Sequence, residues 1–280
     1  MASVVFSSVF GQEERLTLPF EKAHQNKMIR FEAERCSDGI TLELTNKTQR
    51  PMHLSFAAGL TFLPDDTLVQ PRVLVHPRLV ALRAGEKRTV VLQAVCGNAP
   101  KNASSSHPKT TFSRYKDATT PLKDMLAFLV QREWADQVDV QHVVWVFTNA
   151  FNVAGAIHSS LPPEGEKEFI DKLCALIGKK EPGYRMKYEE QDDPNGPAFL
   201  AKAQWMTSKI EYTLHAPAEV HLVIQNAQQD LVRTCMTLPQ QSPGTYRFPF
   251  KIDLNDMPAG DYSVCLLGNG KVLQTLPFTI

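Results

Sequence analysis

The spacing of apolar residues changes twice along the chain. Between residues 28 and 96, short apolar runs alternate with polar residues, and turn sequences such as Ala84-Gly85-Glu86 separate the runs. In one run Ile40, Leu42 and Leu44 share a face, as expected of a half-buried strand. Short strands joined by turns at regular spacing predict an antiparallel β-sandwich.

In the middle of the chain the apolar period lengthens to that of a helix. After Asp139, a plausible cap for the first turn, apolar residues recur at i, i+3, i+4 and i+7. These residues are Val140, Val143, Val144 and Phe147. The segment 139–149 is also rich in β-branched residues, so a strand is the alternative interpretation. With helical patterns on both sides, we predict a helical unit over about 120–178.

The alternation of strands returns near residue 205. Asn269-Gly270 predicts a tight hairpin, because both residues tolerate positive φ. The preceding segment, 181–204, is charged and carries several turn-forming residues, which predicts a linker. The expected fold class is therefore mainly β with a small helical unit. A β-sandwich carrying the helices spans 20–180, and a second β-sandwich spans 205–280.

Composition restricts the classes of function. The 30 basic residues equal the 30 acidic residues in number, which argues against nucleic acid as the main partner. No apolar run approaches the roughly 18–20 residues of a membrane helix, so no membrane-spanning segment is expected. Residues 1–19 are predicted to be a signal-peptide remnant or an N-terminal extension. Within them, Met1–Gln12 is apolar and small but lacks the basic start of a complete secretory signal.

Four segments near the C-terminus carry a family resemblance. They are Ile210–Leu214, Ala218–Ile224, Leu231–Arg233 and Met257–Tyr262. They resemble the flagellar-hook-cap type of immunoglobulin-like domain and the C-terminal sorting domains of secreted Bacteroidetes proteins, over about 207–280. The resemblance implies an immunoglobulin-like β-sandwich with an accessory or sorting role and no active site. It also implies an exported bacterial protein, located outside the cell, on its surface or in the periplasm. Gly260 is expected to lie in a turn where a Cβ is costly.

A second resemblance concerns the centre. Cys96 ends the Thr89–Val95 strand, and Gln141-His142-Val143-Val144-Trp145 follows 44 residues later (141 − 96 − 1). The two motifs resemble those of thioester domains of surface adhesins. There the cysteine thiolate attacks the glutamine carboxamide, ammonia leaves, and the thioester awaits a target amine. The alternative is a thiol that caps a strand and a glutamine that hydrogen-bonds across the junction between sandwich and helix.

The same residues permit a third hypothesis, a cysteine hydrolase. Cys96 would be the nucleophile and His142 the base, with Gln141 or Asn98 stabilising an oxyanion. No metal site and no cofactor are expected, because the sequence contains neither Cys-x-x-Cys nor His-x-x-x-His spacing. Asp65-Asp66 favours a turn over a cation site. Whether Cys235 and Cys265 pair stays open.

The first hypothesis is an exported, non-enzymatic binding or surface-interaction module. Its predicted recognition surface is the loop Gly97–Tyr115, which is rich in Asn, Ser, Lys and Pro. Loops on rigid sandwiches commonly carry recognition. The candidate binding residues are Lys101, His107, Arg114 and Tyr115. The expected partner is a protein or a surface ligand that the sequence does not identify.

Overall fold

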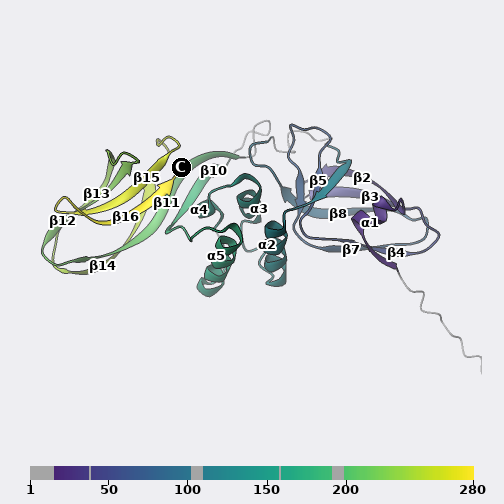
Figure 1. Cartoon of the computed structure of the whole chain (residues 1–280), viewed down its shortest axis with the longest axis horizontal. Helices are drawn as coiled ribbons and strands as arrows, with labels where there is room; N and C mark the ends of the chain where they lie inside the picture. The colour runs from purple at the N-terminus through teal and green to yellow at the C-terminus, as the bar shows by residue number, and fades with distance from the viewer. Residues whose placement is uncertain (1–15, 38, 102–109, 158, 191–198) are drawn as a thin grey trace, which may run out of the picture.

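The computed structural model describes residues 16–37, 39–101, 110–157, 159–190 and 199–280. It shows an elongated molecule with three regions in a row: a β-sandwich, a group of helices and a second β-sandwich (Figure 1). Strands account for 50% of the residues and helices for 19%, so the predicted fold class is confirmed. The segment Met1–Gln12, which we compared with a secretory signal, lies outside the described residues.

The N-terminal sandwich consists of a six-stranded sheet in the order β2-β3-β8-β6-β5-β9 and a three-stranded sheet in the order β1-β4-β7. Its elements are β1 (Leu16–Pro19), α1 (Phe20–Gln25), β2 (Ile29–Cys36), β3 (Gly39–Asn46), β4 (Met52–Phe56), β5 (Leu60–Leu63), β6 (Arg72–Leu74), β7 (Arg78–Leu82), β8 (Lys87–Cys96) and β9 (Arg114–Asp117). Strand β1 pairs in parallel with β4, a feature that the sequence pattern does not predict.

Aromatic rings and alternating aliphatic residues fill this first sandwich. Ile40, Leu42 and Leu44 of β3 are fully buried, as the alternation predicts. Phe20, the first residue of α1, is also fully buried, and its ring stacks on Phe56 with centroids 4.8 Å apart. Burying a side chain of this size stabilises the fold by about 1.5–3 kcal/mol. Phe20 therefore holds α1 against the sandwich.

A buried asparagine joins two turns of the first sandwich. The Asn46 Nδ2 donates to the carbonyls of Arg50 at 2.9 Å and Arg83 at 2.7 Å. Its Oδ1 accepts from the Thr48 N–H at 2.9 Å. Asn46 is 1% exposed, and a buried polar group without partners costs about 1–3 kcal/mol. These bonds therefore hold the turn after β3 against the turn after β7.

The helical unit forms where the sequence predicts it. Its helices are α2 (Thr120–Gln131), α3 (Val140–Asn149), α4 (Val153–Ala156) and α5 (Pro163–Ile177). Asp139 caps α3 by accepting a hydrogen bond from the backbone N–H of His142 at 3.1 Å. The strand interpretation of 139–149 is therefore wrong, because the buried stripe of Val143 and Val144 and the cap both favour the helix.

The second sandwich packs a three-stranded sheet, β10-β11-β14, against a four-stranded sheet, β13-β12-β15-β16. Its strands are β10 (Tyr184–Glu190), β11 (Phe199–Leu214), β12 (Ala218–Asn226), β13 (Leu231–Gln241), β14 (Gly244–Asp253), β15 (Asp261–Gly268) and β16 (Lys271–Thr279). All of their pairings are antiparallel. The hairpin between β15 and β16 has the predicted positive φ values, 48° at Asn269 and 78° at Gly270.

Residues 184–190 do not form the predicted linker. The range 181–204 contains β10 and the start of β11, which pair with each other. Met186 and Tyr188 are buried on one side of β10, while Arg185, Lys187 and Glu189 are only half-buried on the other. The charged residues conceal this alternation in the sequence. The second sandwich therefore begins before residue 205.

Gly260 also differs from its prediction. Its φ is not positive, and an added Cβ would meet the Tyr262 ring at 3.5 Å, an ordinary contact. The residue instead exchanges two backbone hydrogen bonds with Ile280, at 3.2 and 3.0 Å. The geometry at this position therefore has no requirement for glycine.

The buried apolar residues form two clusters, and the boundary between them differs from the one that we predicted. One cluster fills the first sandwich, and a second cluster runs from the helices into the second sandwich. Phe151, which follows α3, meets Tyr188 of β10 with ring centroids 5.0 Å apart. We predicted that the helices belong with residues 20–180, yet their core is continuous with that of the C-terminal sheets.

Candidate functional site

The residues singled out for chemistry meet where β8 ends and α3 begins. Cys96 is the last residue of β8 and pairs with Arg72 of β6 on one side. On the other side, the pairing of β8 with β3 stops at Gln93, so this edge of Cys96 has no strand beside it. The carboxamide of Gln141 takes that place.

Gln141 pairs with the backbone of Cys96 as a neighbouring strand would. Its Oε1 accepts from the Cys96 N–H at 2.8 Å, and its Nε2 donates to the Cys96 carbonyl at 2.6 Å. A residue of an antiparallel ladder points its N–H and C=O to the same neighbour, which is why one carboxamide can engage both. The predicted contact between Cys96 and Gln141 is present, and its hydrogen bonds run to the backbone of Cys96.

A second side chain of the same helix face strengthens this junction. Asn149, the last residue of α3, accepts a hydrogen bond through Oδ1 from the Ala99 N–H at 3.0 Å. Sequence reasoning missed Asn149. Its spacing of eight residues from Gln141 places both on one side of the helix, and this signal was available. The two amides fix both ends of α3 to the end of β8 and the residues after it.

The thiol of Cys96 is buried, and its burial raises its pKa above the ordinary value. The guanidinium groups of Arg72 and Arg35 act in the opposite direction but do not prevail. Reactive cysteines have lowered pKa values, so this thiol lacks the activation that a hydrolase nucleophile needs.

His142 lies in an aromatic cluster of the helical unit. Its Nδ1 contacts the carboxylate of Asp139. The ring stacks on Phe151 with centroids 5.0 Å apart and meets Trp145 edge-on at 5.2 Å. Consecutive residues of a helix point in directions about 100° apart, so His142 and Gln141 face different surroundings. An Asp–His pair can orient a base, but the packing of this ring also accounts for the arrangement.

Two of the four candidate binding residues lie in a strand and not in the predicted loop. Arg114 and Tyr115 belong to β9, where Tyr115 pairs with Phe62 of β5. The Tyr115 hydroxyl lies 3.1 Å from Nδ1 of His24, and its ring meets Phe20 edge-on at 5.1 Å. Tyr115 thus closes the first sandwich, whereas Arg114 is exposed.

Of the other two candidates, Lys101 is the last described residue before the gap in the loop. Lys101 donates from Nζ to the Thr67 carbonyl at 2.6 Å, and its own carbonyl accepts from Gln70 Nε2 at 3.0 Å. His107 lies outside the described residues. The start of the loop is therefore held against the segment 64–70.

Asp65 belongs to this loop anchor. Its carboxylate accepts from the hydroxyl and the N–H of Ser113 and from the Thr111 hydroxyl at 2.6 Å. These bonds, the Ser113 side chain first, hold the pKa of Asp65 below its ordinary value. The residue closes a loop, in agreement with the turn that we favoured over a cation site.

The described residues also bear on metal binding, cysteine pairing and membrane helices. Among the described residues, no cluster of three or more His, Cys, Asp and Glu side chains could hold a metal ion. All five cysteines are free thiols, so Cys235 and Cys265 are not paired with each other. None of the described helices has the length and apolar character that crossing a membrane requires.

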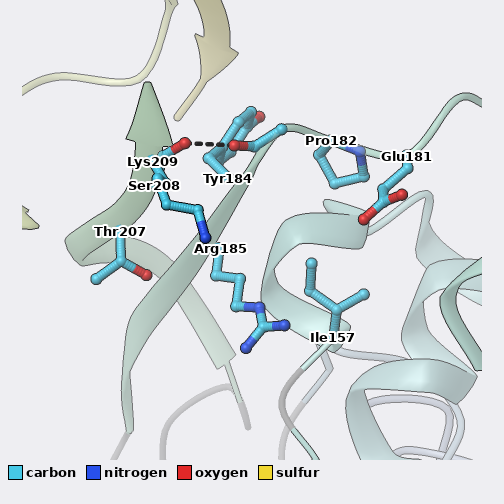
Figure 2. A pocket seen from close by; sticks show the side chains of 9 residues that line it. Ile157, Glu181, Pro182, Tyr184, Arg185, Thr207, Ser208 and Lys209 are labelled. Atoms are coloured by element: carbon cyan, nitrogen blue, oxygen red, sulfur yellow. Dashed lines mark hydrogen bonds between the residues drawn. The ribbon is translucent and has the colours of Figure 1, made fainter. Parts of the chain in front are cut away.

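A hollow that the sequence did not indicate lies between the helical unit and the second sandwich. It measures about 460 Å³ and is lined by Ile157, Glu181, Pro182, Gly183, Tyr184, Arg185, Thr207, Ser208 and Lys209. Figure 2 shows Arg185 and Lys209 on the strand side of this space and Glu181 on the other. The hydroxyl of Ser208 donates to the Gly183 carbonyl, and Arg185 forms an ion pair with Glu166 at 2.5 Å.

Comparison with known proteins leaves these sites as the basis for assigning a function. No model of a known protein family matches the chain, and no curated protein sequence matches it.

Proposed function

We propose that this chain is a non-enzymatic recognition module, exported to the cell surface, the periplasm or the surrounding medium. One observation carries the proposal. The Gln141 carboxamide uses both of its polar ends to bond the backbone of Cys96. Cys96 and Gln141, the pair for which chemistry was considered, therefore connect the first sandwich to α3.

The shape and charge of the molecule support recognition. Two sandwiches lie on either side of the helices, which spreads loops and sheet faces over an elongated surface (Figure 1). The formal net charge is zero, which disfavours nucleic acid as partner. A protein or another surface ligand is the partner that we propose. Export rests on the resemblance of residues 207–280 to sorting domains of secreted proteins.

The substitution Cys96→Ser tests this proposal. Serine keeps the backbone groups that Gln141 bonds and removes only the sulfur. The full chain and this variant are applied to arrays of glycans and extracellular proteins. We expect the same ligands, equal Kd values and complete release in denaturant. Loss of binding in Cys96→Ser, or a bond that survives denaturant, would show that sulfur chemistry is part of the function.

The contact between Cys96 and Gln141 favours one alternative, a thioester. The sulfur would attack the carboxamide carbon of Gln141, the carbon–nitrogen bond would break, and ammonia would leave with the thiol proton. A target amine would then displace the sulfur, form an amide and return a proton to the thiol. For this to happen, Nε2 must give up its hydrogen bond to the Cys96 carbonyl.

Intact mass separates the alternative from the main proposal. A thioester makes the purified chain lighter than its sequence by one ammonia, and treatment with methylamine then adds one methylamine. Cys96→Ser must show neither change. We expect the full sequence mass for both proteins, and the lighter mass in the wild type alone would establish the thioester.

A further inference from the structure

Three positive side chains surround one hydroxyl on the outer face of the sheet β10-β11-β14. Thr207 of β11 pairs with Arg185 of β10 on one side and with Lys251 of β14 on the other. Lys209 lies two residues further along β11 and therefore on the same face. Directly paired residues have Cβ atoms about 4.5–5.5 Å apart, so the side chains of Arg185, Thr207 and Lys251 stand side by side on this face.

The charges of this face are only partly neutralised within the protein. Arg185 is paired with Glu166 at 2.5 Å. Lys209 and Lys251 form no ion pair with any residue in the described ranges. Lys251 instead lies over the ring of Trp205, with Nζ 4.3 Å from the centroid. The face therefore offers two cations, Lys209 and Lys251, to a negatively charged ligand.

The hollow of Figure 2 adjoins this face and extends the site. Arg185, Thr207 and Lys209 line it, and Glu181 reaches it from the far side. A second hollow of about 340 Å³ shares Pro182 and Tyr184 with the first and is also lined by Lys179 and Lys180. A third, of about 220 Å³, shares Gly183, Ser208 and Lys209 with the first. The second and third hollows are therefore neighbours of the first.

We propose that this face binds an acidic oligosaccharide. A carboxylate or sulfate group would lie over Thr207 between Arg185, Lys209 and Lys251, because charge-assisted bonds to such groups are strong. Sugar hydroxyls both donate and accept, which suits Thr207, the acceptor Glu181 and the donor Lys209, all of which line the first hollow. The inference rests on the proposed recognition role and gives it a surface and a class of ligand.

A peptide strand fits this place less well than a sugar. Strand addition binds a peptide through main-chain hydrogen bonds at a sheet edge, whereas Arg185, Thr207 and Lys251 stand side by side on the face of this sheet. The hollow is also lined mainly by charged residues and hydroxyls, which give few apolar anchors for side chains. An acidic peptide is therefore an outcome to be excluded by experiment.

Calorimetry with the full chain tests the inference. The probes are oligogalacturonate, a neutral galactose oligomer of equal length, polyglutamate and inorganic sulfate. We expect oligogalacturonate alone to bind well, and Lys209→Gln to weaken it about tenfold, the loss of one hydrogen bond to a charged group. Lys116→Gln, an exposed change on β9 of the first sandwich, is the matched control and should leave the affinity unchanged.

The salt dependence of binding and the other probes test whether charge and sugar are both required. Affinity should fall as salt rises from about 0.1 to about 1 M, because the screening length shrinks from about 10 to about 3 Å. The inference is overturned if no uronate binds, if Lys209→Gln binds as the wild type does, or if polyglutamate or sulfate binds equally well. If the arrays then reveal another ligand that Lys209→Gln still binds, recognition stands and only this surface is rejected.

Discussion

The two sandwiches of this protein are stabilised in different ways. The first closes on its own core, in which Phe20 packs against Phe56 between the two sheets. The second does not close alone, because its apolar cluster continues into the helices through contacts such as that of Phe151 with Tyr188. The helices follow the first sandwich in the chain but pack as part of the second.

The position of the helices along the chain therefore does not decide which sandwich they pack against. The helical unit is linked to the first sandwich by polar bonds, from Gln141 to Cys96 and from Asn149 to Ala99. A few residues at the end of the first sandwich, Val73 and Val75 among them, also join the second cluster. We therefore expect two cooperative units, with a boundary before α2 and not after α5.

The largest expected loss of stability is in the unit formed by the helices and the second sandwich. Phe169 of α5 is fully buried in the second cluster, so Phe169→Ala should lower the free energy of unfolding by about 3–5 kcal/mol. The three tryptophans lie outside the first sandwich: Trp134 between α2 and α3, Trp145 in α3 and Trp205 in β11. The loss should therefore appear as an earlier fluorescence transition in denaturant, which reports helices and C-terminal sheets together.

Phe20→Ala is the matched change in the first unit. It removes an equally buried ring from the first cluster and should destabilise that sandwich by a similar amount. The tryptophan transition should stay where it is in the wild type, while far-ultraviolet circular dichroism shows an earlier loss of strand. If both variants shift both signals equally, the chain unfolds as one unit, which would contradict the two cooperative units.

The next effect concerns a close approach within the first sandwich. Gly39 has a φ of 155°, and an added Cβ would lie 2.1 Å from the Leu92 carbonyl oxygen. Gly39→Ala should therefore cost about 3 kcal/mol, because the β3–β8 ladder must move apart. Gly260→Ala in the second sandwich is the control and should change the denaturation midpoint little, within about 0.5 kcal/mol. Equal losses for the two would contradict the geometry of Gly39.

A smaller effect tests the bond between the two units. Gln141→Met keeps the length of the side chain but leaves the N–H and C=O of Cys96 without their partner. We expect a loss of about 2 kcal/mol and faster hydrogen exchange at the Cys96 amide. Gln131→Met, on the exposed end of α2, serves as control. Unchanged exchange at Cys96 would show that water or another group replaces the carboxamide without cost.

The smallest expected effect is a pH dependence in the first sandwich. Bonds from Ser113 and Thr111 hold the pKa of Asp65 below its ordinary value of 3.8. The carboxylate therefore stabilises the fold fully above the unfolded-state pKa, and this contribution is lost as the pH falls through the lower, folded-state pKa. The exposed site makes the contribution less than about 1 kcal/mol. The stability difference between wild type and Asp65→Asn should shrink from pH about 7 to pH about 3, and a constant difference would contradict it.

Much of the fold follows from local patterns, and the failures have local causes too. The helices were predictable because a period of 3.6 and the Asp139 cap favour the same structure. Strand β10 was not, because charged residues on its outer face conceal the buried Met186 and Tyr188. The parallel pairing of β1 with β4 and the shared core depend on tertiary packing, which no short stretch of sequence encodes.

In the candidate site, too, some features follow from local sequence and others depend on tertiary packing. The contact of Cys96 with Gln141 was predictable from two short motifs, but the bonding of the carboxamide to the backbone was not. That detail depends on where the pairing of β3 with β8 stops. Arg114 and Tyr115 were placed in a loop because β9 is a short edge strand with little alternation. The face around Thr207 was missed because its residues come from three strands.

The buried amide of Asn46 has a practical consequence for producing the protein. Asn46-Lys47-Thr48 is an acceptor sequence for N-linked glycosylation, which attaches the sugar to Nδ2. That nitrogen already donates to Arg50 and Arg83, and the residue has almost no exposed surface. A glycan added during translation in a eukaryotic host would keep the first sandwich from closing. Chains secreted from such a host should carry Asn46 unmodified, and Thr48→Val would remove the acceptor motif.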